Sequence, residues 1–258
     1  MAIDPAVPDS PHDIPAPSPQ HPGRVWLIGA GPGAADLLTV RGARLLAQAE
    51  AVLHDALVTE EILALCPQAV LIPVGKRSGQ RSTAQVEINA RLVQAAQQYR
   101  RVVRLKGGDP MLFGRADEEM RALEAHGVPY EIVPGITAAL AAAASARRPL
   151  TRRGIARSVS LFTSSTAPDL PGEVIMPNGD TLVQYMGGRE ATATARRLLQ
   201  LGHAPSTPVV VVENCSRPDE RIYHLQLSAL EPGLQACSGP VLVMIGPALA
   251  DRPDPFLS

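Results

Sequence analysis

Residues 25–39, VWLIGAGPGAADLLT, and residues 102–115, VVRLKGGDPMLFGR, decide the fold expected for this chain. In each stretch an apolar run leads directly into a glycine-rich turn. Such runs are typical of buried strands, and glycine lets the backbone turn sharply where a strand ends. In open α/β sheets, ligands bind at the edge where the strands end. The first stretch therefore predicts a turn where the backbone can approach a ligand closely, and the second predicts a strand that ends at a ligand-binding edge.

Outward from these stretches, short apolar runs alternate with helical patterns. This alternation predicts an α/β protein with open sheets. Strands are expected at residues 25–29, 51–54, 70–74, 101–105, 130–133, 159–163, 181–185, 209–213 and 241–245, and helices at 37–49, 84–99, 117–126, 136–146 and 190–201.

Composition divides the chain into a tail and two domains. Residues 1–23 carry seven prolines and almost no large apolar side chains, which predicts a disordered tail. The arginine-rich turn SARRPLTRRG, residues 145–154, separates two series of strands and helices. We therefore expect an N-terminal α/β domain at residues 24–144 and a C-terminal α/β domain at residues 145–258.

Charge and cysteine content narrow the class of protein. A formal net charge of −1 provides no global field for nucleic acid or an anionic membrane. The three cysteines form no C-x-x-C pair, so we expect neither disulfides nor a metal site. The longest helix-like apolar stretch, residues 136–146, is well short of the ~20 residues of a membrane span, and the N-terminus has no signal-peptide core. A cytoplasmic location is expected.

The glycine turn at residues 29–33 is ambiguous by itself. Its spacing is G-x-G-x-G where a dinucleotide fingerprint has G-x-G-x-x-G, and Pro32 removes one amide that a pyrophosphate would bind. An NAD-dependent oxidoreductase and a tight turn without a ligand both remain open.

Polar residues follow several other expected strands. Asp109 lies on the glycine turn after residues 101–105, where a carboxylate can bind ribose hydroxyls or an ammonium group, although a plain Asp-Pro turn is the alternative. Asp55 follows residues 51–54 and is a candidate general base or, alternatively, a helix cap. Thr137 begins a helix of small residues, and Met186, a core methionine in the plainer interpretation, ends residues 181–185.

Taken in order, GAGPG, VLHDALV, VGKRSG, VVRLKGGDPMLFGR, VPGITAA, PLTRRG, LVQYMGG and VVVVENCSRPDER form a linear series. This series closely resembles the tetrapyrrole methylase family, in particular its members that methylate uroporphyrinogen III. The resemblance runs from about Val25 to about Gly246, and it leads us to expect the stand-alone type of enzyme, without the NAD-linked domain that is fused to some relatives.

The resemblance implies a homodimer whose two α/β domains hold S-adenosylmethionine in the cleft between them, with no metal. It implies two methyl transfers to uroporphyrinogen III, giving precorrin-2 for sirohaem or cobalamin. Asp55 matches the proton acceptor of the family and Lys76 its proton donor. The implied cofactor-binding residues are Pro32, Gly107, Gly108, Asp109, Leu112, Thr137, Ala138, Met186 and Cys215.

The substrate carries eight carboxylates, which suits arginine side chains as bidentate clamps. The candidates are Arg77, Arg115, Arg152 and Arg153, each of which is alternatively a solvated surface residue.

Two departures from the family pattern lie near the expected substrate side. Arg152 stands where relatives have histidine, and Thr163-Ser164-Ser165 stands where they have Thr-Gly-His. Another precorrin methyltransferase and a catalytically inactive binding protein therefore stay open as alternatives.

Overall fold

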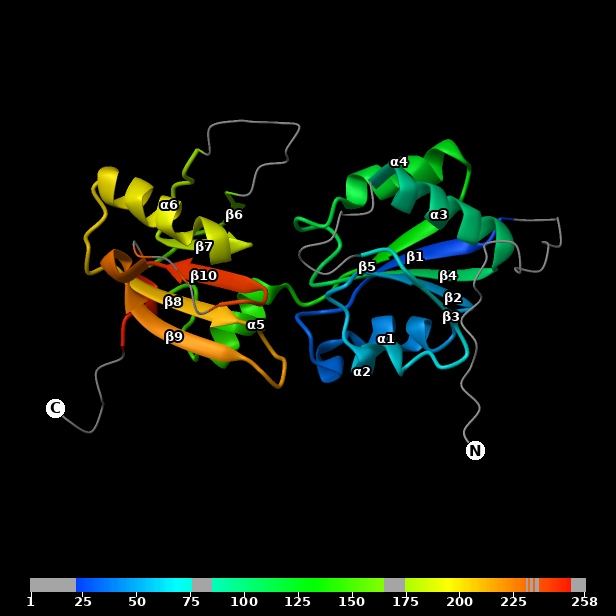
Figure 1. Cartoon of the computed structure of the whole chain (residues 1–258), viewed down its shortest axis with the longest axis horizontal. Helices are drawn as coiled ribbons and strands as arrows, with labels where there is room; N and C mark the ends of the chain where they lie inside the picture. The colour runs from blue at the N-terminus through cyan, green and yellow to red at the C-terminus, as the bar shows by residue number, and fades with distance from the viewer. Residues whose placement is uncertain are drawn as a thin grey trace.

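The computed structural model describes residues 22–75, 85–164, 175–230, 232, 234 and 237–251. Its elements form two α/β halves that lie side by side, with the N-terminal half on the right in Figure 1. The prediction of an α/β protein with two open sheets is confirmed.

The N-terminal half is built on a parallel sheet, sheet A. Its described elements are β1 (Arg24–Gly29), α1 (Val40–Leu46), β2 (Ala51–His54), α2 (Glu60–Leu63), β3 (Val70–Pro73), α3 (Gln85–Gln98), β4 (Arg101–Lys106), α4 (Ala116–Ala125) and β5 (Tyr130–Val133). The strand order is β3-β2-β4-β1-β5, and every neighbouring pair runs parallel. Helices α3 and α4 cover one face and α1 and α2 the other (Figure 1). All five strands therefore end at the same edge.

The two faces of sheet A explain the apolar runs in the sequence. On β1, Val25 and Leu27 pack in the core beneath α3 and α4, whereas Ile28 packs in the core on the α1 side. All three are fully buried. Burial of such a side chain stabilises the fold by about 1.5 to 3 kcal/mol, so continuous apolar strands are expected between two layers of helices.

The C-terminal half is built on a mixed sheet, sheet B. Its described elements are α5 (Ala138–Ser145), β6 (Val159–Thr163), β7 (Thr181–Tyr185), α6 (Gly187–Gln200), β8 (Pro208–Glu213), β9 (Arg221–Gln226) and β10 (Val241–Ile245). The strand order is β6-β7-β10-β8-β9, with β6 and β7 parallel and the other pairs antiparallel.

Helix α5 packs on sheet B, although the sequence-based boundary placed residues up to 144 in the first domain. Ala139, Ala142 and Ala143 join the core that contains Val183 and Met244. Small side chains let this helix approach the sheet closely. By its packing α5 therefore belongs with the C-terminal half, and the chain passes between the halves at residues 134–137.

Several elements differ from the predicted bounds. The helix expected at residues 37–49 is a short 3₁₀ turn, Ala35–Leu37, followed by α1, because the Thr39 side chain accepts a hydrogen bond from the Gly42 amide and caps α1 there. Strand β9 and the four-residue α2 were not predicted. None of the helices in the described part of the chain has the length and apolar character needed to cross a membrane.

Candidate active site

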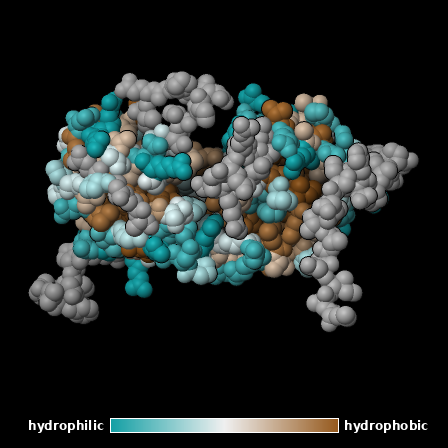
Figure 2. Space-filling view, in the orientation of Figure 1, coloured by the Kyte–Doolittle hydropathy of each residue, from teal (hydrophilic) through white to brown (hydrophobic). Residues whose placement is uncertain are grey.

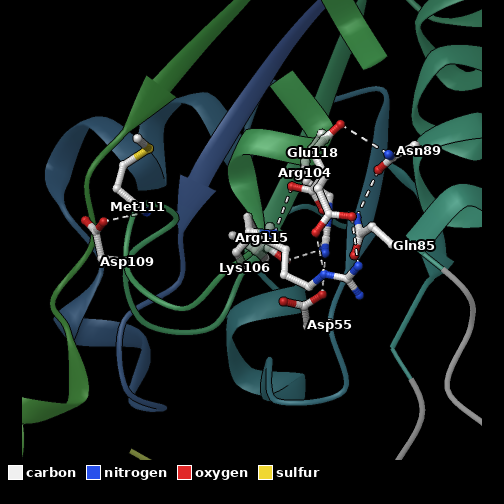
Figure 3. Close-up of polar contacts among 11 residues, drawn as sticks. Asp55, Gln85, Asn89, Arg104, Lys106, Asp109, Met111, Arg115 and Glu118 are labelled. Atoms are coloured by element: carbon white, nitrogen blue, oxygen red, sulfur yellow. Dashed lines mark hydrogen bonds and ion pairs between the residues drawn. The ribbon is translucent and has the colours of Figure 1, made fainter. Parts of the chain in front are cut away.

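The loops after β1, β4 and β5 meet at the carboxyl edge of sheet A. The turn after β1 and the turn after β4 exchange two backbone hydrogen bonds, Gly31 N to Gly108 O at 3.1 Å and Gly108 N to Gly31 O at 2.7 Å. The Asp109 carboxylate accepts the Met111 amide at 2.8 Å and the Gly135 amide at 2.9 Å. Figure 3 shows the hydrogen bond between Asp109 and Met111. Asp109 thus ties the loop after β4 to the loop after β5.

A cavity of about 240 Å³ lies beside these loops and is lined from both halves of the chain. All nine residues that the family resemblance assigned to the cofactor line it. From the first half these are Pro32, Gly107, Gly108, Asp109 and Leu112; the others are Thr137 in the segment between the halves, and Ala138, Met186 and Cys215 in the C-terminal half. The cavity therefore joins motifs that are separated by more than a hundred residues.

Several lining residues were not predicted. Tyr185 donates or accepts a hydrogen bond with the Thr137 hydroxyl, and its own hydroxyl accepts the Ala139 amide at 3.2 Å. The Phe113 ring packs on the Tyr185 ring with centroids 5.0 Å apart. Burial raises the pKa of the Tyr185 phenol despite these hydrogen bonds, so it remains neutral. Phe113 and Tyr185 could have been predicted as lining residues from their positions inside GGDPMLFGR and LVQYMGG. Each is adjacent in the sequence to a predicted lining residue and therefore lies in or next to the same loop.

Contacts of the loop after β8 join the two halves at one side of the cavity. Arg217 lines the cavity, and its Nη2 donates to the Leu57 carbonyl oxygen at 2.7 Å. The neighbouring Ser216 hydroxyl accepts the Ala34 amide at 3.0 Å. The loop after β8 is thereby fixed to two loops of the N-terminal half.

Cys215 lines the cavity as a buried, neutral thiol. Burial, with a further contribution from the nearby Glu220, raises the pKa of Cys215 to about 12. Its side chain therefore serves as a small apolar wall rather than as a nucleophile.

Asp55 lies just after β2 and is not among the residues that line the cavity, whereas Leu57, two residues later, is. Its Oδ1 accepts a hydrogen bond from Arg104 Nη2 at 2.5 Å. Behind this pair, the buried Glu119 accepts hydrogen bonds from Arg104 Nε and from Lys106 Nζ, both at 2.8 Å. Figure 3 shows Arg104 and Lys106 in this cluster beside Asp55.

The charges in this cluster affect one another. Burial acts to lower the pKa of Arg104, but Asp55 and Glu119 outweigh it and raise that pKa, so the guanidinium stays charged. Burial and the adjacent Arg104 lower the pKa of the Lys106 ammonium, which Glu119 offsets only in part. Arg104, Lys106 and Glu119 were not predicted, although two basic residues at alternate positions of an apolar strand indicate a buried acidic partner.

The remaining predicted site residues do not line the cavity or lie outside the described residues. Arg115 is exposed and paired with Glu118 at the start of α4. Arg152 forms a tight turn with Ala156, and Arg153 beside it is exposed. Lys76 and Arg77 lie outside the described residues, as does Ser165.

Comparison with known proteins identifies the family of this chain. A model of the family described as tetrapyrrole (corrin/porphyrin) methylases matches residues 24–231. The chain belongs to the tetrapyrrole methylase family.

Among curated relatives, a uroporphyrinogen-III C-methyltransferase of Pseudomonas aeruginosa is 45% identical over 233 residues, covering 89% of this chain and 95% of the relative. A siroheme synthase of Edwardsiella ictaluri is 42% identical over 239 residues, covering 92% of this chain but only 52% of the relative. This chain thus spans about half the length of that longer protein.

Among solved structures, the uroporphyrin-III C-methyltransferase of Thermus thermophilus complexed with S-adenosylhomocysteine is 40% identical, with a TM-score of 0.78. The match covers 88% of this chain and 98% of that structure. A cobalt precorrin-4 methyltransferase is 29% identical, with a TM-score of 0.76, and covers 88% of this chain and 96% of that one.

Proposed function

We propose that this chain transfers methyl groups from S-adenosylmethionine to two ring carbons of uroporphyrinogen III, giving precorrin-2. The observation that carries the proposal is the convergence on one cavity of the nine residues that the family resemblance assigns to the cofactor. The acceptor is proposed from the P. aeruginosa relative of nearly equal length.

The residues around the cavity fit S-adenosylmethionine. Asp109 offers a carboxylate for ribose hydroxyls or an ammonium group, and the glycine turn at residues 107–108 lets a ligand approach the backbone. Leu112, Val212 and Leu242 supply apolar walls suited to a flat base and a sulfur-bearing chain. When bound, this cosubstrate supplies an electrophilic methyl group on a positively charged sulfur.

The task of the chain is to align the acceptor carbon with that methyl group and to exclude water. After transfer, the methylated ring must lose a proton, and we assign its removal to Asp55. Arg104 holds the Asp55 carboxylate in one orientation through the 2.5 Å hydrogen bond. Lys76 is the proposed proton donor, and Arg77, Arg115, Arg152 and Arg153 are proposed to bind the substrate carboxylates.

The test is an anaerobic incubation with S-adenosylmethionine and freshly prepared uroporphyrinogen III, followed by mass spectrometry of the tetrapyrrole. We expect a gain of two methyl groups. Asp55→Asn should reduce turnover by about 10²-fold to 10⁴-fold while S-adenosylhomocysteine still binds. Full turnover by Asp55→Asn would remove Asp55 from the mechanism.

A second candidate is methylation of a later precorrin, which the similarity to the cobalt precorrin-4 methyltransferase favours. Its identity of 29% is below the 40% of the Thermus structure, so we place it second. No methylation of uroporphyrinogen III, together with measurable cofactor binding, would favour this candidate or an inactive binding protein.

We also propose that the enzyme is a cytoplasmic homodimer. In Figure 2, apolar surface (brown) is visible on the N-terminal half. The edge strand β3 exposes 48% of Val70 and 42% of Leu71, and an apolar sheet edge of this kind is what a subunit contact covers. Analytical ultracentrifugation tests the dimer, and a monomer at micromolar concentration would contradict it.

A further inference from the structure

A cluster of buried charges lies between sheet A and α4, directly behind Asp55 (Figure 3). Arg104 and Lys106 are two residues apart on β4, so their side chains leave the same face of the sheet. Each is only 2% exposed, and Glu119 on α4 is fully buried. Burial of three ionised groups is costly unless they pair closely, so their arrangement is tightly constrained.

The Arg104 guanidinium is held on three sides. Its Nε donates to Glu119 at 2.8 Å, its Nη1 to the Leu105 carbonyl oxygen at 3.1 Å, and its Nη2 to Asp55 at 2.5 Å. Lys106 donates to the other oxygen of Glu119 at 2.8 Å. Asp55, with 29% of its side chain exposed, is the one member of the cluster that reaches the surface.

We propose that Glu119 and Lys106 are positioning residues that act through Arg104 to set the orientation and proton affinity of Asp55. This inference rests on the proposed function, in which Asp55 removes the proton. Glu119 fixes the guanidinium that orients Asp55, and Lys106 neutralises the remaining charge of Glu119.

The sign of each effect follows from the charge balance. Two cations, Arg104 and Lys106, face two carboxylates, Asp55 and Glu119. Loss of the Glu119 charge leaves an excess of positive charge, which favours the ionised form of Asp55 and makes it a weaker base. Loss of the Lys106 charge leaves an excess of negative charge and favours the protonated form.

Other titratable groups near Asp55 stay in place in both cases. His54 on β2 precedes it, with Nδ1 3.3 Å from the Asp55 carbonyl oxygen. The ion pair of Arg115 and Glu118 lies at the start of α4. Because these groups are the same in every variant, they do not change the direction of the expected shifts.

The experiment compares the full-length wild-type protein with Glu119→Gln, Lys106→Met and the double variant. Protein carrying carbon-13 in its aspartate carboxyl groups is titrated by NMR, and Asp55→Asn identifies the Asp55 resonance. The kcat, the KM for S-adenosylmethionine and the pH profile of kcat are measured in parallel. Asp117→Asn, which neutralises an exposed carboxylate on the same helix, is the matched control.

We expect the Asp55 titration and the acidic limb of the kcat profile to move down by about half a pH unit or more in Glu119→Gln and up by a similar amount in Lys106→Met. The kcat should fall about tenfold or more in Glu119→Gln, with little change in KM. The charge-balanced double variant should titrate close to the wild type and exceed the kcat of Glu119→Gln. Asp117→Asn should match the wild type.

Shifts in the same direction in both single variants, or none in either, would overturn the inference, since a merely structural role predicts no opposite signs. If Glu119→Gln does not fold, Lys106→Met alone carries the test, and the absence of an upward shift of the Asp55 titration in that variant would overturn the inference. The NMR titration needs no turnover, so wild-type protein that fails to methylate uroporphyrinogen III would count against the proposed function and leave the titration to decide the inference.

Discussion

Gly135 is where a single added methyl group should damage both the fold and the site. It lies in the loop after β5, and its amide donates to Asp109 at 2.9 Å. A Cβ at this position would lie 2.2 Å from the Gly108 carbonyl oxygen and 2.7 Å from Gly29 Cα. All of the close atoms belong to backbone, so no side chain can turn aside to relieve the contact.

The size of the effect follows from these distances. To reach even a tight contact of 3.0 Å, the loops after β4 and β5 must separate by about 0.8 Å. Overpacking of well-packed sites costs about 1 to 3 kcal/mol, and a clash confined to backbone belongs at or above the upper end. At about 3 kcal/mol, the melting temperature of a chain of this size falls by about 6 to 12 °C.

The same displacement should weaken cofactor binding. Gly108 and Asp109 both line the cavity, and Asp109 bonds to the amide of the residue that moves. We expect Gly135→Ala to bind S-adenosylhomocysteine at least about tenfold more weakly, which corresponds to a loss of 1.4 kcal/mol. Isothermal titration calorimetry gives the affinity, and thermal unfolding gives the stability.

Gly188→Ala is the matched control. A Cβ at Gly188, in the first turn of α6, would lie 3.4 Å from Val241 Cγ2, an ordinary contact. Because alanine is also a better helix former than glycine, stability should be unchanged or slightly higher. Wild-type melting temperature and wild-type affinity in Gly135→Ala would refute the argument from backbone contact.

Two further predictions concern the C-terminal half. Arg217→Met should lose the 2.7 Å hydrogen bond to the Leu57 carbonyl oxygen and so loosen the contact between the halves. We expect S-adenosylhomocysteine to bind about fivefold to tenfold more weakly, as measured by calorimetry. Unchanged affinity would show that this hydrogen bond does not support the cavity. Burial acts to raise the pKa of the Glu213 carboxyl, but two backbone amides before β10 and the Arg221 guanidinium hold that pKa below its usual range. The ionised Glu213 carboxylate therefore stabilises the fold fully above pH 4.5, the ordinary pKa of the group, and this stabilisation is lost as the pH falls through the lower pKa of the folded state. The melting temperatures of wild type and Glu213→Gln should accordingly converge below about pH 4.5. A difference in melting temperature that stays constant with pH would contradict this prediction.

The cavity was predictable because of how parallel sheets are built. The strands of sheet A end at one edge, so loops that follow strands in the sequence must meet in space. Asp109, after β4, and Pro32, after β1, could be placed together on this ground alone, and the family resemblance supplied the residues from the second half. The bounds of β2, β5, β6, β7 and β10 were also predicted without error, since these strands are short and are bounded mostly by proline, glycine or polar residues.

What the sequence did not reveal depends on contacts between elements. Strand β9, with the sequence RIYHLQ, lies at an edge of sheet B and is only partly buried, so it lacks an apolar run. Glu119 appears in the sequence as one acidic residue among several on an amphipathic helix. Only the packing of α4 over β4 shows that this carboxylate, unlike its neighbours Glu118 and Asp117, faces Arg104 and Lys106.

The structure also accounts for one departure from the family pattern. Ser164 stands where the resembling family has glycine, and the sequence placed this change near the substrate. In the structure its hydroxyl accepts a hydrogen bond from the Gln184 amide group and lies 3.3 Å from the Thr194 hydroxyl on α6. Gln184 is fully buried, so its amide needs a partner that a glycine side chain does not provide. The serine therefore satisfies a buried polar group beneath α6, a role within the C-terminal half that the sequence alone did not indicate.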